Sequence, residues 1–391
     1  MRQIRRIPQK APTPSIRVAL NENFRTGKLL FKGKFKLRTE EATYVLDESV
    51  GEFTVKFQQK HLSFRSPRRQ FNFRNFRKIV FYPEGKGVFY WNGIPYSGEI
   101  LFVLKGKNIV VINKLLLSEY LKGVIPSEIP SHNEEYFQAI KAQAVAARTY
   151  ALYHIKHPNS NLFDVYADSR DQVYQGKRIE TPLADKAVEE TTGLILMTRD
   201  GRYIETQFHS TCGGMLEMRD DYGGNITRNK GFLNDKTEDE YNCVTSPLYR
   251  WVEKVDTRDI LRNLVQLKKL SFTQAQKLQQ NGFVLDIQIL SRRPSGRIDR
   301  LIIQINEQSF ILNERQIRRV LSPVPDKPLP SSLILFKSIP SQPDQFFIIG
   351  AGFGHGKGLC QWGAIGMALK KKSFEEILSF YYPDLVLKKE Y

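Results

Sequence analysis

Residues 120–150 read YLKGVIPSEIPSHNEEYFQAIKAQAVAARTY. Small apolar residues recur at helical spacing in the second half of this stretch, which predicts a closely packed, buried helix. Ser131 and Glu134 have the spacing of a capping box and are predicted to begin that helix. Residues 126–130, with a proline at each end, predict a stiff irregular link. Glu128 lies inside the link, where a rigid scaffold can present its side chain to a cleft.

Two basic residues of the predicted helix carry a further expectation. Lys141 and Arg148 are one heptad apart, so they lie on roughly the same side of the helix. They either point into one groove together or form a solvated basic edge. The sequence leaves both interpretations open.

The sequence before this stretch is typical of β-structure. Short runs of Val, Ile, Phe and Tyr are broken by turn signals such as residues 83–87 and the Asn92-Gly93 pair. We therefore predict an α+β protein with a basic, β-rich N-terminal part, residues 1–112, and a mixed α/β core, residues 113–391. The two parts are expected to pack as one unit.

The charge balance favours an extended anionic partner. The chain has 59 Lys and Arg against 41 Asp and Glu, a formal net charge of +18. Residues 55–79 contain no acidic residue and interleave basic with phenylalanine side chains. This segment is either a polyanion-binding surface or a set of amphipathic strands whose phenylalanines face the core. Since no recognised nucleic-acid module occurs, a nucleic-acid partner is not expected.

Membrane insertion and disulfide scaffolding are not indicated. No stretch approaches the roughly 20 uninterrupted apolar residues of a membrane helix, and no signal peptide is visible at residues 1–20. Three cysteines, Cys212, Cys243 and Cys360, are too few to build a fold. Three interpretations stay open. In the first, His209, Cys212 and Cys243 bind a metal ion. In the second, Cys212 and Cys243 form a disulfide, and in the third they are two small buried residues. Neither a metal nor a cofactor is our main expectation.

Five blocks of sequence occur in an order that resembles the SpoIID/LytB family. They read YLKGVIPSE (120–128), KAQAVAARTY (141–150), DSRDQVYQG (168–176), FHSTCGG (208–214) and GHGKGLCQWGA (354–364). The resemblance extends from about Asn113 to the end of the sequence. Some family members carry zinc-binding Cys and His before the Gln172 position, but Val165, Tyr166, Arg170 and Asp171 stand there, so that site is not expected here.

The resemblance implies a peptidoglycan lytic transglycosylase of the cell envelope that cleaves between MurNAc and GlcNAc in peptide-stripped glycan, leaving anhydroMurNAc ends. Glu128 takes the place of the family's catalytic acid. One carboxylate suits this reaction because the 6-hydroxyl of the same sugar is the nucleophile, so Asp168 and Asp171 need no partner role. The alternative is a noncatalytic wall-binding protein that stimulates an N-acetylmuramoyl-L-alanine amidase.

The resemblance also implies residues that contact the glycan. They are Lys141, Arg148, Gln172, Tyr174, His209, Ser210, His355 and Gln361. For Lys141 and Arg148 the alternative is that they hold Glu128. The glycine-rich residues 354–358 form either a wall of the substrate groove or a structural turn. The expected partners are glycan strands and an amidase that strips them of peptides.

Overall fold

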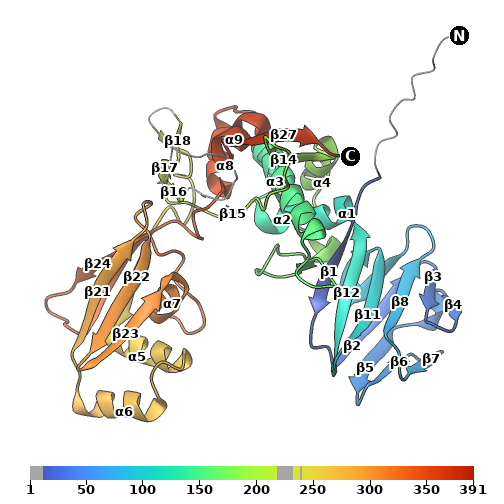
Figure 1. Ribbon diagram of the computed structural model, residues 1–391, viewed down its shortest axis with the longest axis horizontal. Coiled ribbons are helices and arrows are strands. Elements are labelled where there is room, and N and C mark those ends of the chain that lie inside the picture. The colour runs from blue at the N-terminus through green and yellow to red at the C-terminus, as the bar shows by residue number, and fades with distance from the viewer. Residues whose placement is uncertain (1–11, 218–231, 238–239) are drawn as a thin grey trace, which may run out of the picture. The chain divides into compact units, whose positions relative to one another are not determined.

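Figure 1 shows the computed structural model of the protein, which describes residues 12–217, 232–237 and 240–391. The chain forms two compact units. Unit 1 runs to Thr206 and also includes Asp384–Tyr391, and unit 2 comprises Gln207–Pro383. Helices and strands are both abundant, which confirms the α+β class with a β-rich N-terminal part. Within the described residues, no helix has the length and apolar character needed to cross a membrane.

Two β-sheets form the first part of unit 1. The larger has the order β13-β1-β12-β11-β8-β3-β4, and the smaller has the order β10-β9-β2-β5-β6-β7. The strands of the larger sheet are β1 (Ser15–Asn21), β3 (Phe35–Arg38), β4 (Thr43–Leu46), β8 (Lys78–Pro83), β11 (Glu99–Lys105), β12 (Asn108–Leu116) and β13 (Val165–Tyr166). Those of the smaller sheet are β2 (Thr26–Lys32), β5 (Phe53–Gln58), β6 (His61–Arg65), β7 (Gln70–Phe73), β9 (Val88–Trp91) and β10 (Ile94–Ser97).

Aromatic side chains join the two sheets. The ring of Phe64 on β6 lies 5.1 Å from those of Phe81 on β8 and Phe102 on β11. Phe31 on β2 lies 4.5 Å from Phe35 on β3. All five rings are buried, and each such pair contributes about 0.5–1.5 kcal/mol beyond its buried area. This aromatic layer is the core between the sheets.

The basic segment, residues 55–79, extends from β5 into β8. Phe64 and Phe76 are buried, which confirms that these two phenylalanines face the core, while Phe71 and Phe73 are half-buried. Its basic side chains are exposed, on the strands and on the turns between them. They are Lys56, Lys60, Arg65, Arg68, Arg69, Arg74, Arg77 and Lys78.

Strand β12 leads directly into the helices that carry Glu128. They are α1 (Leu117–Lys122), α2 (Ile125–Glu128), the 3-10 turn η2 (Glu134–Tyr136), α3 (Phe137–Lys156), the 3-10 turn η3 (Gly176–Ile179) and α4 (Pro182–Glu190). The expected irregular link is therefore helical as far as Glu128, since a proline is tolerated in a first helical turn. The predicted helix is confirmed as α3, and its alanines are buried.

The helix start was assigned to the wrong residue. Asn133 caps η2, which runs into α3, by accepting a hydrogen bond from the Glu135 amide. Ser131 is buried, and its hydroxyl accepts a bond of 3.0 Å from the Thr181 hydroxyl at the start of α4. A tertiary contact thus takes the side chain that local spacing had assigned to capping.

Unit 1 combines the β-rich part with these helices. Residue 112, where we placed the boundary, lies inside β12, which pairs along its length with β1 and β11. The unit is completed by β14 (Leu194–Thr198), which pairs antiparallel with β27 (Leu385–Lys389). Residues on both sides of unit 2 in the sequence therefore build the same unit.

Unit 2 contains two three-stranded sheets. They are β20 (Arg250–Asp256), β25 (Gln345–Ala351) and β24 (Ile334–Ser338), and β21 (Leu285–Arg292), β22 (Ile298–Ile305) and β23 (Gln308–Asn313). Its α-helices are α5 (Thr257–Gln266), α6 (Phe272–Asn281), α7 (Glu314–Val320), α8 (Gln361–Leu369) and α9 (Phe374–Tyr381). Its short strands are β15 (Phe208–His209), β16 (Met215–Glu217), β17 (Phe232–Asn234), β18 (Lys236–Thr237), β19 (Glu240–Tyr241) and β26 (Leu359–Cys360). Buried Val255, Leu261, Leu301, Leu312 and Ile348 belong to one core.

The glycine-rich residues 354–358 pack closely against unit 2 itself. Arg297 is fully buried, and its guanidinium donates to the carbonyls of Met215 and Cys212, each at 2.8 Å. A Cβ added to Gly356, whose φ is +82°, would lie 2.4 Å from Arg297 Cζ. Of the two interpretations of this motif, the structure supports the structural turn, because the close approach that glycine permits is used by the protein's own side chain.

We expect Gly356→Ala to lower the free energy of unfolding by about 1–3 kcal/mol more than Gly282→Ala, because a methyl group overpacks the Arg297 site. Gly282 is a matched control, since its φ is +79° and a Cβ there would meet nothing within 4 Å. Urea unfolding followed by circular dichroism measures both variants. Equal losses of unfolding free energy in the two variants would show that the Arg297 side chain moves away from the added methyl group without loss of stability.

Candidate functional site

Glu128 is the last residue of α2 and is half-buried. Its Oε1 accepts a hydrogen bond of 3.1 Å from the backbone N–H of Val173. The same segment is held a second time, because Gln175 donates from its amide to the Gly123 carbonyl and from Nε2 to Ser127 Oγ, at 3.2 and 3.0 Å. The DSRDQVYQG block therefore fixes the α2 turn and orients the carboxylate.

Two phenols lie within electrostatic range of Glu128. Burial raises the pKa of Tyr120 well above its usual value, and the charges of Asp171 and Glu128 add to the effect. Burial also raises the pKa of Tyr150, together with its hydrogen bond to Asp171 and the charges of Glu205 and Glu128. Both hydroxyls therefore keep their protons at neutral pH.

Asp171 is occupied by the protein itself. Its side chain is 3% exposed and accepts bonds from Tyr150 Oη at 2.6 Å, Asn159 Nδ2 at 2.8 Å and the Tyr166 amide at 2.7 Å. Asp168 is exposed and forms an ion pair of 2.8 Å with Arg170. These contacts give both carboxylates partners within the protein.

Arg148 does not point toward a groove. Its side chain is buried, with NH1 donating to the Leu194 carbonyl at 3.1 Å and NH2 donating to the Val188 carbonyl and Thr191 Oγ1 at 3.0 and 3.2 Å. Burial lowers its pKa to about 10, so the guanidinium stays charged at neutral pH. The expectation that Arg148 binds sugar does not fit this burial, because its donors satisfy the end of α4 and the start of β14.

Lys141 has a different partner from Arg148. Its Nζ is 3.3 Å from Glu190 Oε2 at the end of α4, and its side chain is 15% exposed. The two basic residues of α3 therefore have different partners, Lys141 at the end of α4 and Arg148 at the end of α4 and the start of β14.

Gln172 and Tyr174 are also internal. Gln172 is fully buried, accepting from Tyr120 Oη at 3.1 Å and donating to the Ala147 carbonyl at 3.3 Å. Tyr174 is 4% exposed, and its hydroxyl donates to Asn113 Oδ1 at 2.8 Å. Both residues position the segment that binds Glu128, a role that motif matching could not separate from substrate contact.

The remaining candidates belong to unit 2. Burial lowers the pKa of His209 well below its usual value, so its imidazole is neutral, and its Nδ1 bonds the Lys357 carbonyl at 3.0 Å. His355 accepts from the Lys357 amide at Nδ1, and its Nε2 therefore donates to the Phe208 carbonyl, at 3.0 and 3.1 Å. Ser210 is half-buried and Gln361 is buried at the start of α8.

The residues of the alternative metal set separate. Cys212 and Cys243 gather with Asp235 and Cys360, whereas His209 lies outside this group. Sequence reasoning missed Asp235 altogether and left Cys360 without a role. The sequence held one signal for this group, because the three cysteines that meet here are all the cysteines of the chain.

The matches to known families follow the division of the chain into two units. The profile of the family described as Stage II sporulation protein (SpoIID) matches residues 105–197, which include Glu128. Residues 202–358 match a family described as a domain of unknown function (DUF8618). The former segment lies in unit 1 and almost all of the latter in unit 2.

Three curated relatives each match more than two thirds of this chain. An uncharacterized protein of Brachyspira hyodysenteriae is 33% identical over 305 residues, which cover 78% of this chain and 74% of that protein. Stage II sporulation protein D of Bacillus subtilis is 28% identical over 291 residues, 69% of this chain and 74% of that protein. The amidase enhancer of Bacillus subtilis is 26% identical over 299 residues, 68% of this chain and 40% of that protein.

We expect Arg148→Lys to lower the free energy of unfolding by about 2–4 kcal/mol, because a single ammonium cannot satisfy the acceptors that the guanidinium fork reaches. The reciprocal exchange Lys141→Arg, at a partly exposed ion pair, should change it by less than about 1 kcal/mol. Urea unfolding and glycan sedimentation are measured on both variants. Wild-type stability with lost glycan binding in Arg148→Lys would restore its role as a substrate contact.

Proposed function

Since the chain belongs to the SpoIID family, we propose that it is a peptidoglycan lytic transglycosylase in which Glu128 is the general acid and then the general base. The observation that carries this proposal is the carboxylate itself. It is half-buried, oriented by the Val173 amide and located inside the matched segment. Asp171 accepts bonds from Tyr150, Asn159 and the Tyr166 amide, which hold a loop of the protein together.

The reaction needs one carboxyl group and no water. The Glu128 carboxyl donates its proton to O4 of GlcNAc as the bond from that oxygen to C1 of MurNAc breaks. C1 then carries oxocarbenium character, and O6 of the same MurNAc bonds to it. The O6 proton returns to Glu128, which restores the acid. The products are a free GlcNAc end and a 1,6-anhydroMurNAc end.

The substrate in this proposal is glycan from which stem peptides have been removed, at the cell envelope. An amidase would supply such strands, because it cleaves the bond between MurNAc and the peptide. The exposed basic segment, residues 55–79, supports attraction to an anionic wall, since its positive side chains have no acidic residue among them.

The second candidate is stimulation of an amidase without catalysis. The similarity to the amidase enhancer favours it, and the chain matches 40% of that protein. This function would retain glycan binding and would not need the Glu128 proton.

We expect Glu128→Gln to reduce formation of anhydroMurNAc ends by about 10²–10⁴-fold, the usual contribution of general acid–base catalysis. The amide keeps the acceptor for Val173, so folding and glycan binding should stay close to wild type. Glu134→Gln, at an exposed carboxylate of the following turn, is the matched control and should retain activity. Mass analysis of products from purified, peptide-stripped glycan measures all three proteins.

An active Glu128→Gln protein would disprove the mechanism. If wild-type protein forms no anhydro ends, but wild type and Glu128→Gln equally increase product release by a wall amidase, the second candidate is correct.

We expect reversal of Arg68, Arg69 and Arg74 to Glu to weaken sedimentation with cell walls by about 10-fold at low ionic strength. The difference should shrink as salt rises, because screening shortens the range of exposed charges. Reversal of the exposed Lys86, Lys105 and Lys107 makes the same change in net charge at other turns of unit 1. Equal weakening by both sets would show that binding follows net charge and not the basic segment.

A further inference from the structure

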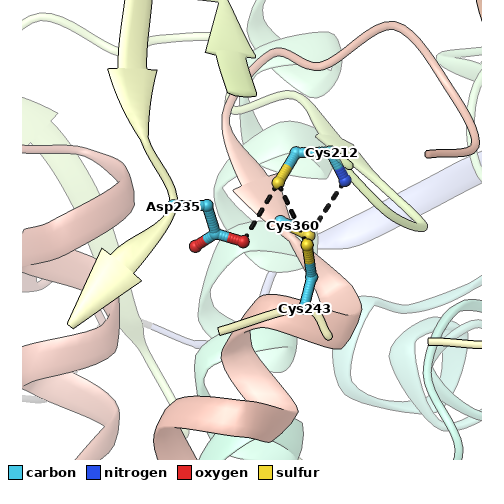
Figure 2. A group of neighbouring side chains, drawn as sticks. All are labelled: Cys212, Asp235, Cys243 and Cys360. Atoms are coloured by element: carbon cyan, nitrogen blue, oxygen red, sulfur yellow. Dashed lines mark hydrogen bonds between the residues drawn. The ribbon is translucent and has the colours of Figure 1, made fainter. Parts of the chain in front are cut away.

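The three cysteines of the chain converge on one buried acid. Cys212 lies between β15 and β16, Asp235 between β17 and β18, Cys243 just after β19, and Cys360 at the start of α8. All four side chains are buried, and their ligand atoms lie within 4.8 Å of one another. Figure 2 shows the Asp235 carboxylate facing the sulfurs. Residues separated widely in sequence thus place three sulfurs and one carboxylate in a single pocket of unit 2.

The separations suit a tetrahedral metal ion. Ligand atoms around zinc, at about 2.3 Å for sulfur and about 2.0 Å for oxygen, stand roughly 3.5–3.8 Å apart. The Sγ atoms of Cys212 and Cys243 are 3.5 Å apart, and Cys212 Sγ is 3.0 Å from Asp235 Oδ2. Side-chain shifts of about an ångström would therefore seat an ion.

Backbone amides already point at the sulfurs. Cys360 Sγ accepts from the amides of Cys212 and Gly363, at 3.2 and 3.3 Å, and Cys212 Sγ accepts from the Gly214 amide at 3.3 Å. Bonds of this kind favour thiolates, as does the α8 N-terminus that Cys360 caps. These donors would stabilise the sulfurs once a metal ion has displaced the thiol protons.

The carboxylate is oriented by its other oxygen. Asp235 Oδ1 accepts from Tyr381 Oη at 2.7 Å and from Asn242 Nδ2 at 3.1 Å. Oδ2 is left to face Cys212. Outer partners that fix a ligand in this way are characteristic of metal sites.

A cation also balances the charges. Three thiolates and one carboxylate would place four negative charges in a buried cluster, where charge is costly without a partner. The buried guanidinium of Arg297 donates to the Cys212 carbonyl and supplies one positive charge nearby. A divalent ion would supply two more.

We propose that Cys212, Cys243, Cys360 and Asp235 form a structural zinc site that ties four segments of unit 2 together. Zinc binding releases the three thiol protons and any proton on Asp235 to solvent, with no change of oxidation state. Four protein ligands close the coordination sphere, so the ion has no position for substrate. The site is independent of Glu128 and of the reaction proposed for unit 1.

The test uses the full chain, expressed with zinc and purified with a thiol reductant. We expect elemental analysis to find one zinc per chain, and the thiols to resist modification until a chelator is added. Replacement of zinc by cobalt should give thiolate-to-cobalt charge-transfer absorption with tetrahedral visible bands. A reduced protein that binds neither metal would overturn the proposal, as would an intact mass showing a Cys212–Cys243 disulfide under these conditions.

Variants identify the ligands. Asp235→Asn and Cys360→Ser should weaken zinc binding in a chelator competition by at least about 100-fold, beyond the 10–100-fold expected for an outer partner. Tyr381→Phe keeps all four ligands and should weaken binding by about 10–100-fold, so it remains informative if a ligand variant does not fold. Asp286→Asn, at an exposed carboxylate of β21, should bind as wild type. Full affinity in either ligand variant contradicts the assignment.

Discussion

The buried guanidinium of Arg148 organises unit 1. A charge removed from water needs acceptors, and Arg148 finds them at the end of α4 and the start of β14, which fixes both against α3. On α3, the carbonyl of Ala147 holds Gln172, and the next residue, Val173, donates to Glu128. The proposed acid is thus positioned through a series of contacts that begins at a charge it does not touch.

Asp171 and Glu128, two acids of unit 1, illustrate how different surroundings give similar groups different roles. Asp171 is surrounded by donors and holds a loop against α3, whereas the Glu128 carboxylate accepts a bond from the Val173 amide and is half-buried. The phenols of Tyr120 and Tyr150, which lie within electrostatic range of Glu128, keep their protons and add no negative charge near it. This arrangement suits a reaction in which one carboxyl transfers a proton in both directions.

Local patterns predicted what depends on neighbours in sequence. The α+β class and helix α3 both follow from spacing. Helical spacing could not reveal that other elements cover Arg148, nor that Thr181 binds the Ser131 hydroxyl. The grouping of Cys212 with Cys360 likewise depends on packing between distant segments. Motif matching therefore located the important blocks but assigned substrate roles to side chains that the structure uses internally.

The pairing of β14 with β27 has a consequence for synthesis on the ribosome. Residues 384–391 are translated after all of unit 2, yet they supply the strand that covers β14 and the Tyr391 side chain that interacts with Arg148. While unit 2 is being translated, β14 therefore lacks its partner strand and Arg148 lacks one of its partners. Unit 2 can fold first. Unit 1 is then completed when residues 384–391 pair with β14, through contacts between residues far apart in sequence.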